Sequence, residues 1–75
     1  MKVQVYGRLT DIMGNNGLNP EGIENTDQLK KKLLSLYPDL SGIDYAIAVN
    51  NQIVRENHPL KKNDVVSLLP PFSGG

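Results

Sequence analysis

Residues 26–38 read TDQLKKKLLSLYP. Apolar side chains recur at spacings of four, three and one, at Leu29, Leu33, Leu36 and Tyr37. Together with Leu34 they are expected to form one buried stripe on an amphipathic helix. Thr26 is a candidate N-cap, because its hydroxyl can accept a hydrogen bond from an amide of the first turn. Pro38 disfavours helical geometry at the residue before it and ends the pattern. The stretch predicts one amphipathic helix, about 27–37.

Short β-rich runs lie on both sides of this helix. We expect strands at the N-terminus around Val3 and Val5, at 45–49, at 52–55 and at 65–69. A weaker strand is expected at 18–23, and Pro20 requires it to be either an edge strand or short. Asn50 and Asn51 tolerate left-handed geometry, as a two-residue hairpin turn requires. The polar segment 56–63 is expected to be a connection, with Leu60 in the core.

One helix and several strands predict an α+β domain of two layers: a mixed sheet of four to five strands packed on one main helix. The chain has 75 residues, enough for a single domain, expected over residues 1–69. A domain of this size buries only about 60% of the surface of its unfolded chain. Its thin core favours a binding or carrier module over a self-contained enzyme.

Composition narrows the class of partner. Lys plus Arg and Asp plus Glu number eight each, so no basic excess favours nucleic acid. No apolar run approaches the roughly 20 residues that span a bilayer, and residues 1–5 alternate polar and apolar, unlike a signal peptide. We expect a cytoplasmic protein with no membrane partner. Residues 30–32 (KKK) are interpreted as the solvated face of the helix; the alternative is steering toward an acidic partner.

Residues that could carry chemistry are sparse in residues 1–69. The chain has no cysteine and a single histidine, His58, interpreted as a solvated loop side chain. The carboxylates are scattered, and no phosphate-binding glycine loop occurs. We therefore expect neither a metal site nor a bound cofactor.

The segment 70–75 reads PPFSGG and is expected to be a flexible functional tail. Pro70 and Pro71 cannot continue a strand by hydrogen bonding, and the single phenylalanine, Phe72, stands where it can pack on another protein. Gly74 and Gly75 have no Cβ, so they can thread a narrow channel. The alternative is that the glycines are only a frayed end.

The strand and helix order resembles the ubiquitin-like β-grasp fold. Residues 64–75, DVVSLLPPFSGG, resemble the end of the MoaD family, the small subunits of molybdopterin synthase, and the likeness extends over the whole chain. The most specific part is the ending Pro-Pro-x-Ser-Gly-Gly. The related thiamin-pathway carrier ThiS shares the two glycines but usually lacks the double proline. Phe72 and Asn51 depart from the residues more common in the family.

The resemblance implies a sulfur carrier that is not an enzyme by itself but the small subunit of a sulfurtransferase. A MoeB-like enzyme would use ATP to adenylate the carboxylate of Gly75, and sulfur would then replace AMP to give a thiocarboxylate. The sulfur would be delivered to precursor Z inside a MoaE-like large subunit, in a heterotetramer. Ser73 and Gly74 would thread the partner's channel. The interface would be formed by Leu69, Pro70, Pro71 and Phe72.

Three alternatives remain open at this point. The chain could be a ThiS-like carrier for thiamin thiazole or another metabolite. It could be a ubiquitin-like modifier whose Gly75 is joined to lysine. It could also be a plain interaction module, for which an extension beyond Gly75 would be harmless.

Overall fold

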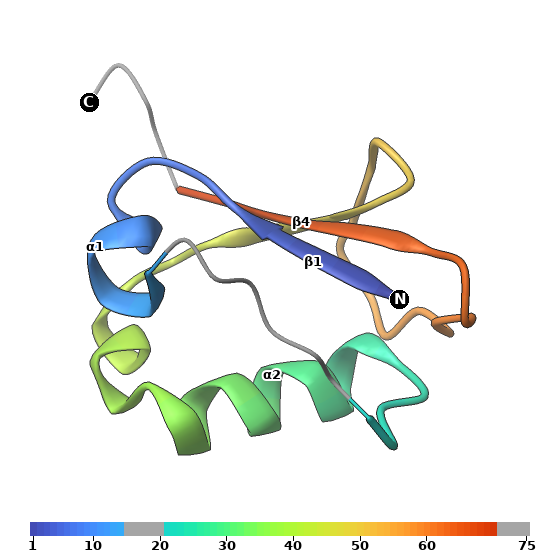
Figure 1. Cartoon of the computed structure of the whole chain (residues 1–75), viewed down its shortest axis with the longest axis horizontal. Helices are drawn as coiled ribbons and strands as arrows, with labels where there is room; N and C mark the ends of the chain where they lie inside the picture. Colours follow the sequence, from blue (N-terminus) through green and yellow to red (C-terminus); the bar gives the residue numbers. More distant parts are fainter. Residues whose placement is uncertain (15–20, 71–75) are drawn as a thin grey trace.

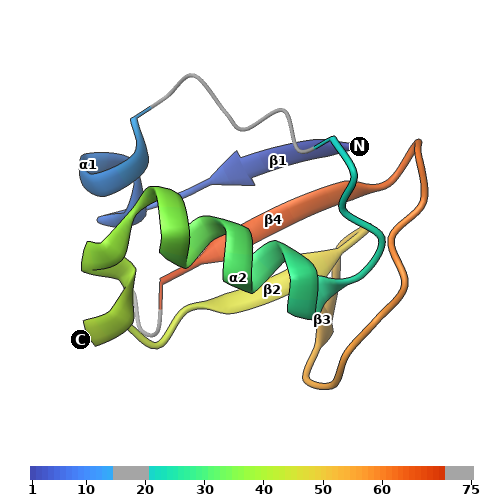
Figure 2. The same cartoon turned by 90° about the horizontal axis from the view of Figure 1, so that it is seen from below.

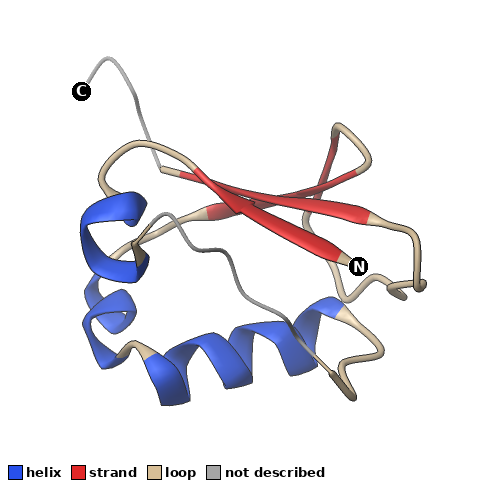
Figure 3. Ribbon diagram, in the orientation of Figure 1, coloured by secondary structure: helices blue, strands red, loops and turns tan. Residues whose placement is uncertain are grey.

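The structure, a computed structural model, describes residues 1–14 and 21–70. The elements follow in the order β1 (Lys2–Val5), α1 (Leu9–Met13), α2 (Thr26–Leu36), the 3-10 helix η1 (Pro38–Gly42), β2 (Ala46–Val49), β3 (Gln52–Val54) and β4 (Val65–Leu69). The strands form one layer and the helices the other (Figures 1 and 3). The predicted α+β architecture, with one main helix against a mixed sheet, is therefore confirmed.

The sheet has the strand order β1-β4-β2-β3. β4 pairs parallel with β1, with Val5 opposite Leu68, and antiparallel with β2, with Ala46 opposite Leu69. Seen from below, α2 crosses the face of the sheet (Figure 2). The last strand in the sequence thus lies in the interior of the sheet, with a paired neighbour on each side.

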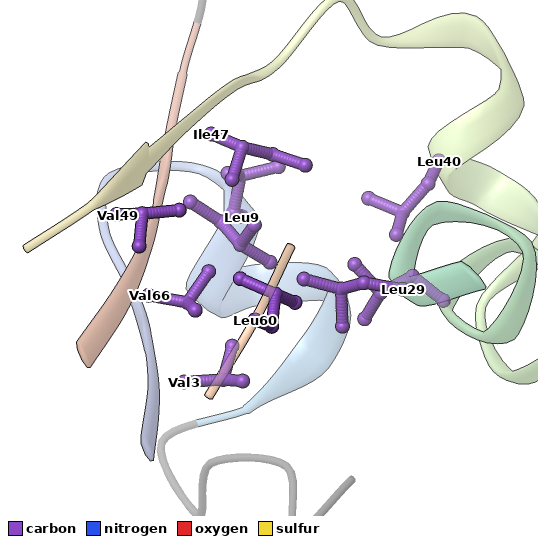
Figure 4. Packing of buried hydrophobic residues seen from close by; sticks show 10 residues of the cluster. Val3, Leu9, Leu29, Leu40, Ile47, Val49, Leu60 and Val66 are labelled. Carbon is purple, nitrogen blue, oxygen red and sulfur yellow. The ribbon is translucent and has the colours of Figure 1, made fainter. Parts of the chain in front are cut away.

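The core lies between the sheet and α2 (Figure 4). Alternation along β4 turns Val66 and Leu68 inward, and both are fully buried. From α2, Leu29 and Leu33 are fully buried against them, as the helical spacing predicts. Leu34 and Leu36, which were expected in the same buried stripe, are each 47% exposed. The buried stripe of α2 is therefore narrower than predicted. Leu60, in the connection before β4, is also buried in this cluster, as expected.

The start of α2 corrects the predicted cap. Asn25 is the N-cap, with an extended backbone, and its side chain accepts a hydrogen bond from the Gln28 amide at 2.9 Å. Thr26 is already helical and 2% exposed. Its Oγ1 accepts a hydrogen bond from the amide of His58 at 2.9 Å. The threonine hydroxyl is used by the loop before β4, so the cap falls to the preceding asparagine.

The hairpin between β2 and β3 is confirmed in detail. Asn50 and Asn51 have φ values of 51° and 70°, the left-handed geometry expected of them. Asn50 also joins the hairpin to the start of β4: its Nδ2 donates to Asp64 at 3.0 Å, and its Oδ1 accepts from the Val65 amide at 3.0 Å.

Two further parts of the prediction differ from the structure. The short helix α1 was not predicted, although it buries Leu9 completely. Of the strand expected at 18–23, residues 18–20 lie outside the described residues. Glu21 and Gly22 form a turn, and Ile23 belongs to no strand. Gly22 has a φ of 79°, a conformation that favours a turn over an extended strand.

Candidate functional site

The candidate site begins where β4 ends. Leu69 is the last residue of the strand and Pro70 follows it, and both are partly buried. Because Leu69 pairs with Ala46 of β2 and the β1 ladder reaches Leu68, the chain emerges between two neighbouring strands. The other predicted site residues, Pro71, Phe72, Ser73, Gly74 and Gly75, lie outside the described residues, so their roles stay predictions, as does the boundary between a domain at 1–69 and a tail at 70–75.

One face of the sheet carries neither α1 nor α2 (Figure 3). Because successive strand residues point to opposite faces, the inward positions of Val66 and Leu68 place Leu69 on this uncovered face. Ile53 of β3 lies on this face by the same alternation and is 55% exposed. Tyr6, the residue after β1, is 46% exposed, and its hydroxyl donates at 3.0 Å to Oε1 of Gln4, which alternates with the buried Val3 and so lies on the same face. We call Tyr6, Ile53, Val65 and Leu69 the outer apolar group.

The middle of the uncovered face is made of small residues. Ala48 of β2 pairs with Ser67 of β4, and they are 4% and 8% exposed. Ile53 of β3 lies opposite Ala48. A partner that docks here would reach large apolar side chains around a centre of small ones, immediately beside the origin of the tail.

Ionisable groups of the described residues offer little chemistry. No group of three or more His, Asp or Glu within residues 1–14 and 21–70 could hold a metal ion. His58 is partly buried, in a loop whose backbone pairs with the start of α2. A hydrogen bond from the Lys61 amide, and a second from Asn50, lower the pKa of Asp64. Burial raises the pKa of Tyr45.

The lysines of α2, Lys30, Lys31 and Lys32, are all exposed, as their interpretation as a solvated face requires. Within the described ranges, no helix is both long and apolar enough to cross a bilayer.

Sequence reasoning named Leu69 and Pro70 but missed Tyr6 and Ile53. A signal was present: Ile53 alternates with its neighbours in β3, and Tyr6 is a large apolar residue directly after β1, out of phase with the inward Val3 and Val5. The pairing of β1 with β4 and of β3 with β2 was needed to show that they share a face with Leu69.

Comparison with known proteins gives a consistent result. The model of the ThiS family matches residues 3–75. A chain described as molybdopterin converting factor subunit 1 from Pyrococcus furiosus is 26% identical, with a TM-score of 0.75 over 95% of both chains. A chain of the complex of subunits 1 and 2 of molybdopterin-converting factor from Helicobacter pylori is 31% identical, with a TM-score of 0.67, over 99% of this chain and 96% of that one.

SAMP1 from Haloferax volcanii is 17% identical, with a TM-score of 0.74, over 99% of this chain and 97% of that one. At this identity the likeness concerns the fold alone. Together these neighbours confirm the ubiquitin-like β-grasp fold and the expected resemblance.

Proposed function

This chain belongs to the ThiS family, and on that premise we propose that it is the sulfur carrier of a molybdopterin synthase. The carrier function follows from the family. The narrower assignment to molybdopterin is supported by the two subunit chains at 26% and 31% identity. It is also supported by the double proline at 70 and 71, which ThiS-like tails usually lack.

The proposed chemistry takes place at the carboxylate of Gly75. A carboxylate oxygen attacks the α-phosphorus of ATP and releases pyrophosphate, which leaves an acyl adenylate. A sulfur donor held by the activating enzyme replaces AMP and gives the thiocarboxylate. The carrier needs no bound cofactor or metal for these steps, since the activating enzyme supplies the nucleotide. We place the reaction in the cytoplasm, where ATP is available.

The proposed partner is a large subunit like subunit 2 of the Helicobacter pylori complex. The observation that supports docking is that the outer apolar group lies on the same face of the sheet as Leu69, the last residue of β4. Tyr6 and Ile53 expose apolar surface on the face from which Leu69 leads into the tail. Interface cores are enriched in aromatic and apolar anchors, so the same partner can bind this face and receive the glycines.

The decisive experiment is the intact mass of the protein purified from its host, or after incubation with an activating enzyme, ATP and a sulfur source. Replacing the terminal OH by SH adds about 16 Da, as expected of a covalent modification. Deletion of Gly74 and Gly75 should abolish the adduct, and copurification of a large subunit should identify the pathway. An unmodified terminus, with full activity of the deletion variant, would reject the proposal.

A ThiS-like role in thiazole synthesis is the second candidate, because the matching family model bears that name. Rescue of a thiamin auxotroph but not of a strain lacking molybdoenzyme activity would favour it. Gly75-linked lysine peptides in a digest of host protein would instead indicate a modifier.

A further inference from the structure

We propose that Gly7 is a positioning residue that sets the direction in which the tail leaves the sheet. The functional consequence rests on the proposed carrier function, but the geometry stands independently. Gly7 follows β1, and Pro70 follows β4, its parallel neighbour (Figure 1). Val5 pairs with Leu68, so continuing the register by two residues brings Gly7 beside Pro70.

The backbone of Gly7 is held firmly in place. Its carbonyl oxygen accepts two hydrogen bonds from Thr10, one from the amide at 3.0 Å and one from the hydroxyl at 2.7 Å. Leu9, two residues on, is fully buried and anchors α1 in the core. On the other side of Gly7, β1 is paired with β4 up to Val5. Gly7 is therefore fixed between a strand and a helix and cannot move aside easily.

The contact itself leaves no room for a side chain. A Cβ on Gly7 would lie 2.9 Å from Cγ of Pro70 and 3.6 Å from its Cβ and Cδ. A Cβ atom essentially never lies within 3.0 Å of a non-bonded heavy atom of another residue. The proline ring thus lies directly against the glycine backbone. The ring is part of the Pro70 backbone, because it joins the nitrogen to the Cα and fixes φ near −65°. A displacement of the ring that its pucker does not absorb therefore also displaces the backbone from which the tail departs.

Two other glycines serve as controls that distinguish the contact with Pro70 from the strain of a positive φ. Gly7 has a φ of +61°, so any substitution there is also strained. Gly14 and Gly22 have φ values of +77° and +79°, yet a Cβ on either would meet no atom within 4 Å. Gly14→Ala and Gly22→Ala therefore place a Cβ on a residue of positive φ without any contact with Pro70. Gly14, with a ψ of 179°, adopts a conformation nearly restricted to glycine, so Gly14→Ala sets an upper limit for the effect of backbone strain alone.

The first test measures tail direction without any enzyme. The chain has no cysteine, so a spin label at Ser73→Cys is unique, and its broadening of backbone amide signals maps where the tail points. We expect Gly7→Ala to change which amides are broadened and Gly14→Ala and Gly22→Ala to leave the map unchanged. Adding Pro70→Ala to Gly7→Ala removes the ring atom at 2.9 Å and should shift the map back toward that of Pro70→Ala alone.

The second test measures adenylation of the same variants by the activating enzyme. A displacement of about 1 Å can cost up to about 10²-fold in rate, so kcat/KM for Gly7→Ala should fall about tenfold or more. The glycine controls should stay within about twofold, and Pro70→Ala should relieve the Gly7→Ala defect. An unchanged broadening map for Gly7→Ala, or equal changes in all three glycine variants, would overturn the inference. Absence of adenylation in the wild type, with the map behaving as expected, would instead reject the proposed function alone.

Discussion

Ile53→Ala tests whether the uncovered sheet face binds the large subunit. Complete burial of an isoleucine side chain contributes about 1.5–3 kcal/mol. Ile53 is 55% exposed in the free protein, so docking can gain roughly half of this, about 1–1.5 kcal/mol. Because 1.4 kcal/mol corresponds to a factor of about ten, the dissociation constant should rise about five- to tenfold.

The matched control is Leu34→Ala. Leu34 is 47% exposed, a fraction similar to the 55% of Ile53. It lies on α2, however, in the layer on the other side of the sheet (Figure 2). Isothermal titration of each variant with the copurified large subunit should show a weaker complex for Ile53→Ala and a dissociation constant within about twofold of the wild type for Leu34→Ala. Thermal unfolding checks that both variants are folded.

Ile53→Asp sharpens the result, because docking would then also bury a carboxylate without a partner, at a cost of several kcal/mol. The complex should become too weak to titrate at micromolar concentration. An unchanged dissociation constant for both Ile53 variants, or an equal loss for Leu34→Ala, would show that the partner does not use this face.

Three further predictions concern stability. Thr26→Val should lower the free energy of unfolding by about 1–3 kcal/mol, because the amide of His58 loses its acceptor. Thr26→Ser keeps the acceptor and serves as the control. Fast hydrogen exchange of the His58 amide in the valine variant alone would identify the lost hydrogen bond as the cause. The pKa of Asp64 is below its ordinary value of 3.8 in the folded state, so its stabilising effect is complete above about pH 4 and is lost as the pH falls further. The free energy of unfolding in urea, measured from about pH 2 to 6, should therefore depend less on pH for Asp64→Asn than for the wild type. The same pH dependence in both proteins would contradict this. Leu33→Ala, at a fully buried position, should cost about 2–5 kcal/mol and lower Tm by roughly 10–40 °C, and a loss as small as that of the exposed Leu34→Ala would contradict the packing described.

Local chemistry made part of the fold predictable. The spacing of Leu29 and Leu33 predicts the buried centre of α2 without reference to any other segment, although Leu34 and Leu36, expected beside them, are exposed. Asn50 and Asn51 likewise adopt the left-handed turn that their side chains tolerate, because a two-residue hairpin demands it. In both cases the residues that determine the geometry lie within one turn of helix or hairpin.

The structure differs from the prediction where contacts between segments distant in the sequence determine the local geometry. Thr26 is a good N-cap by propensity, yet its hydroxyl accepts from His58, 32 residues away. Helix α1 has only five residues, too few to be stable alone, and burial of Leu9 in the core stabilises it. Tyr6 and Ile53 appear as one surface only after the strand order is known. The sequence could predict the elements but not these pairings.

A carrier needs a fixed point of departure for its tail and a surface that selects its partner, and the position of β4 assigns these two requirements to different residues. The strand is paired on both sides, and its inward residues Val66 and Leu68 are fully buried. Opening such a strand requires breaking both ladders and the core, so its free energy of local opening approaches that of global unfolding. The tail thus begins at the end of a strand that is paired on both sides and packed into the core. Tyr6 and Ile53 of the outer apolar group are exposed, so either can change with little effect on the core. Partner choice can therefore vary on the uncovered face while the point from which the tail departs stays constant.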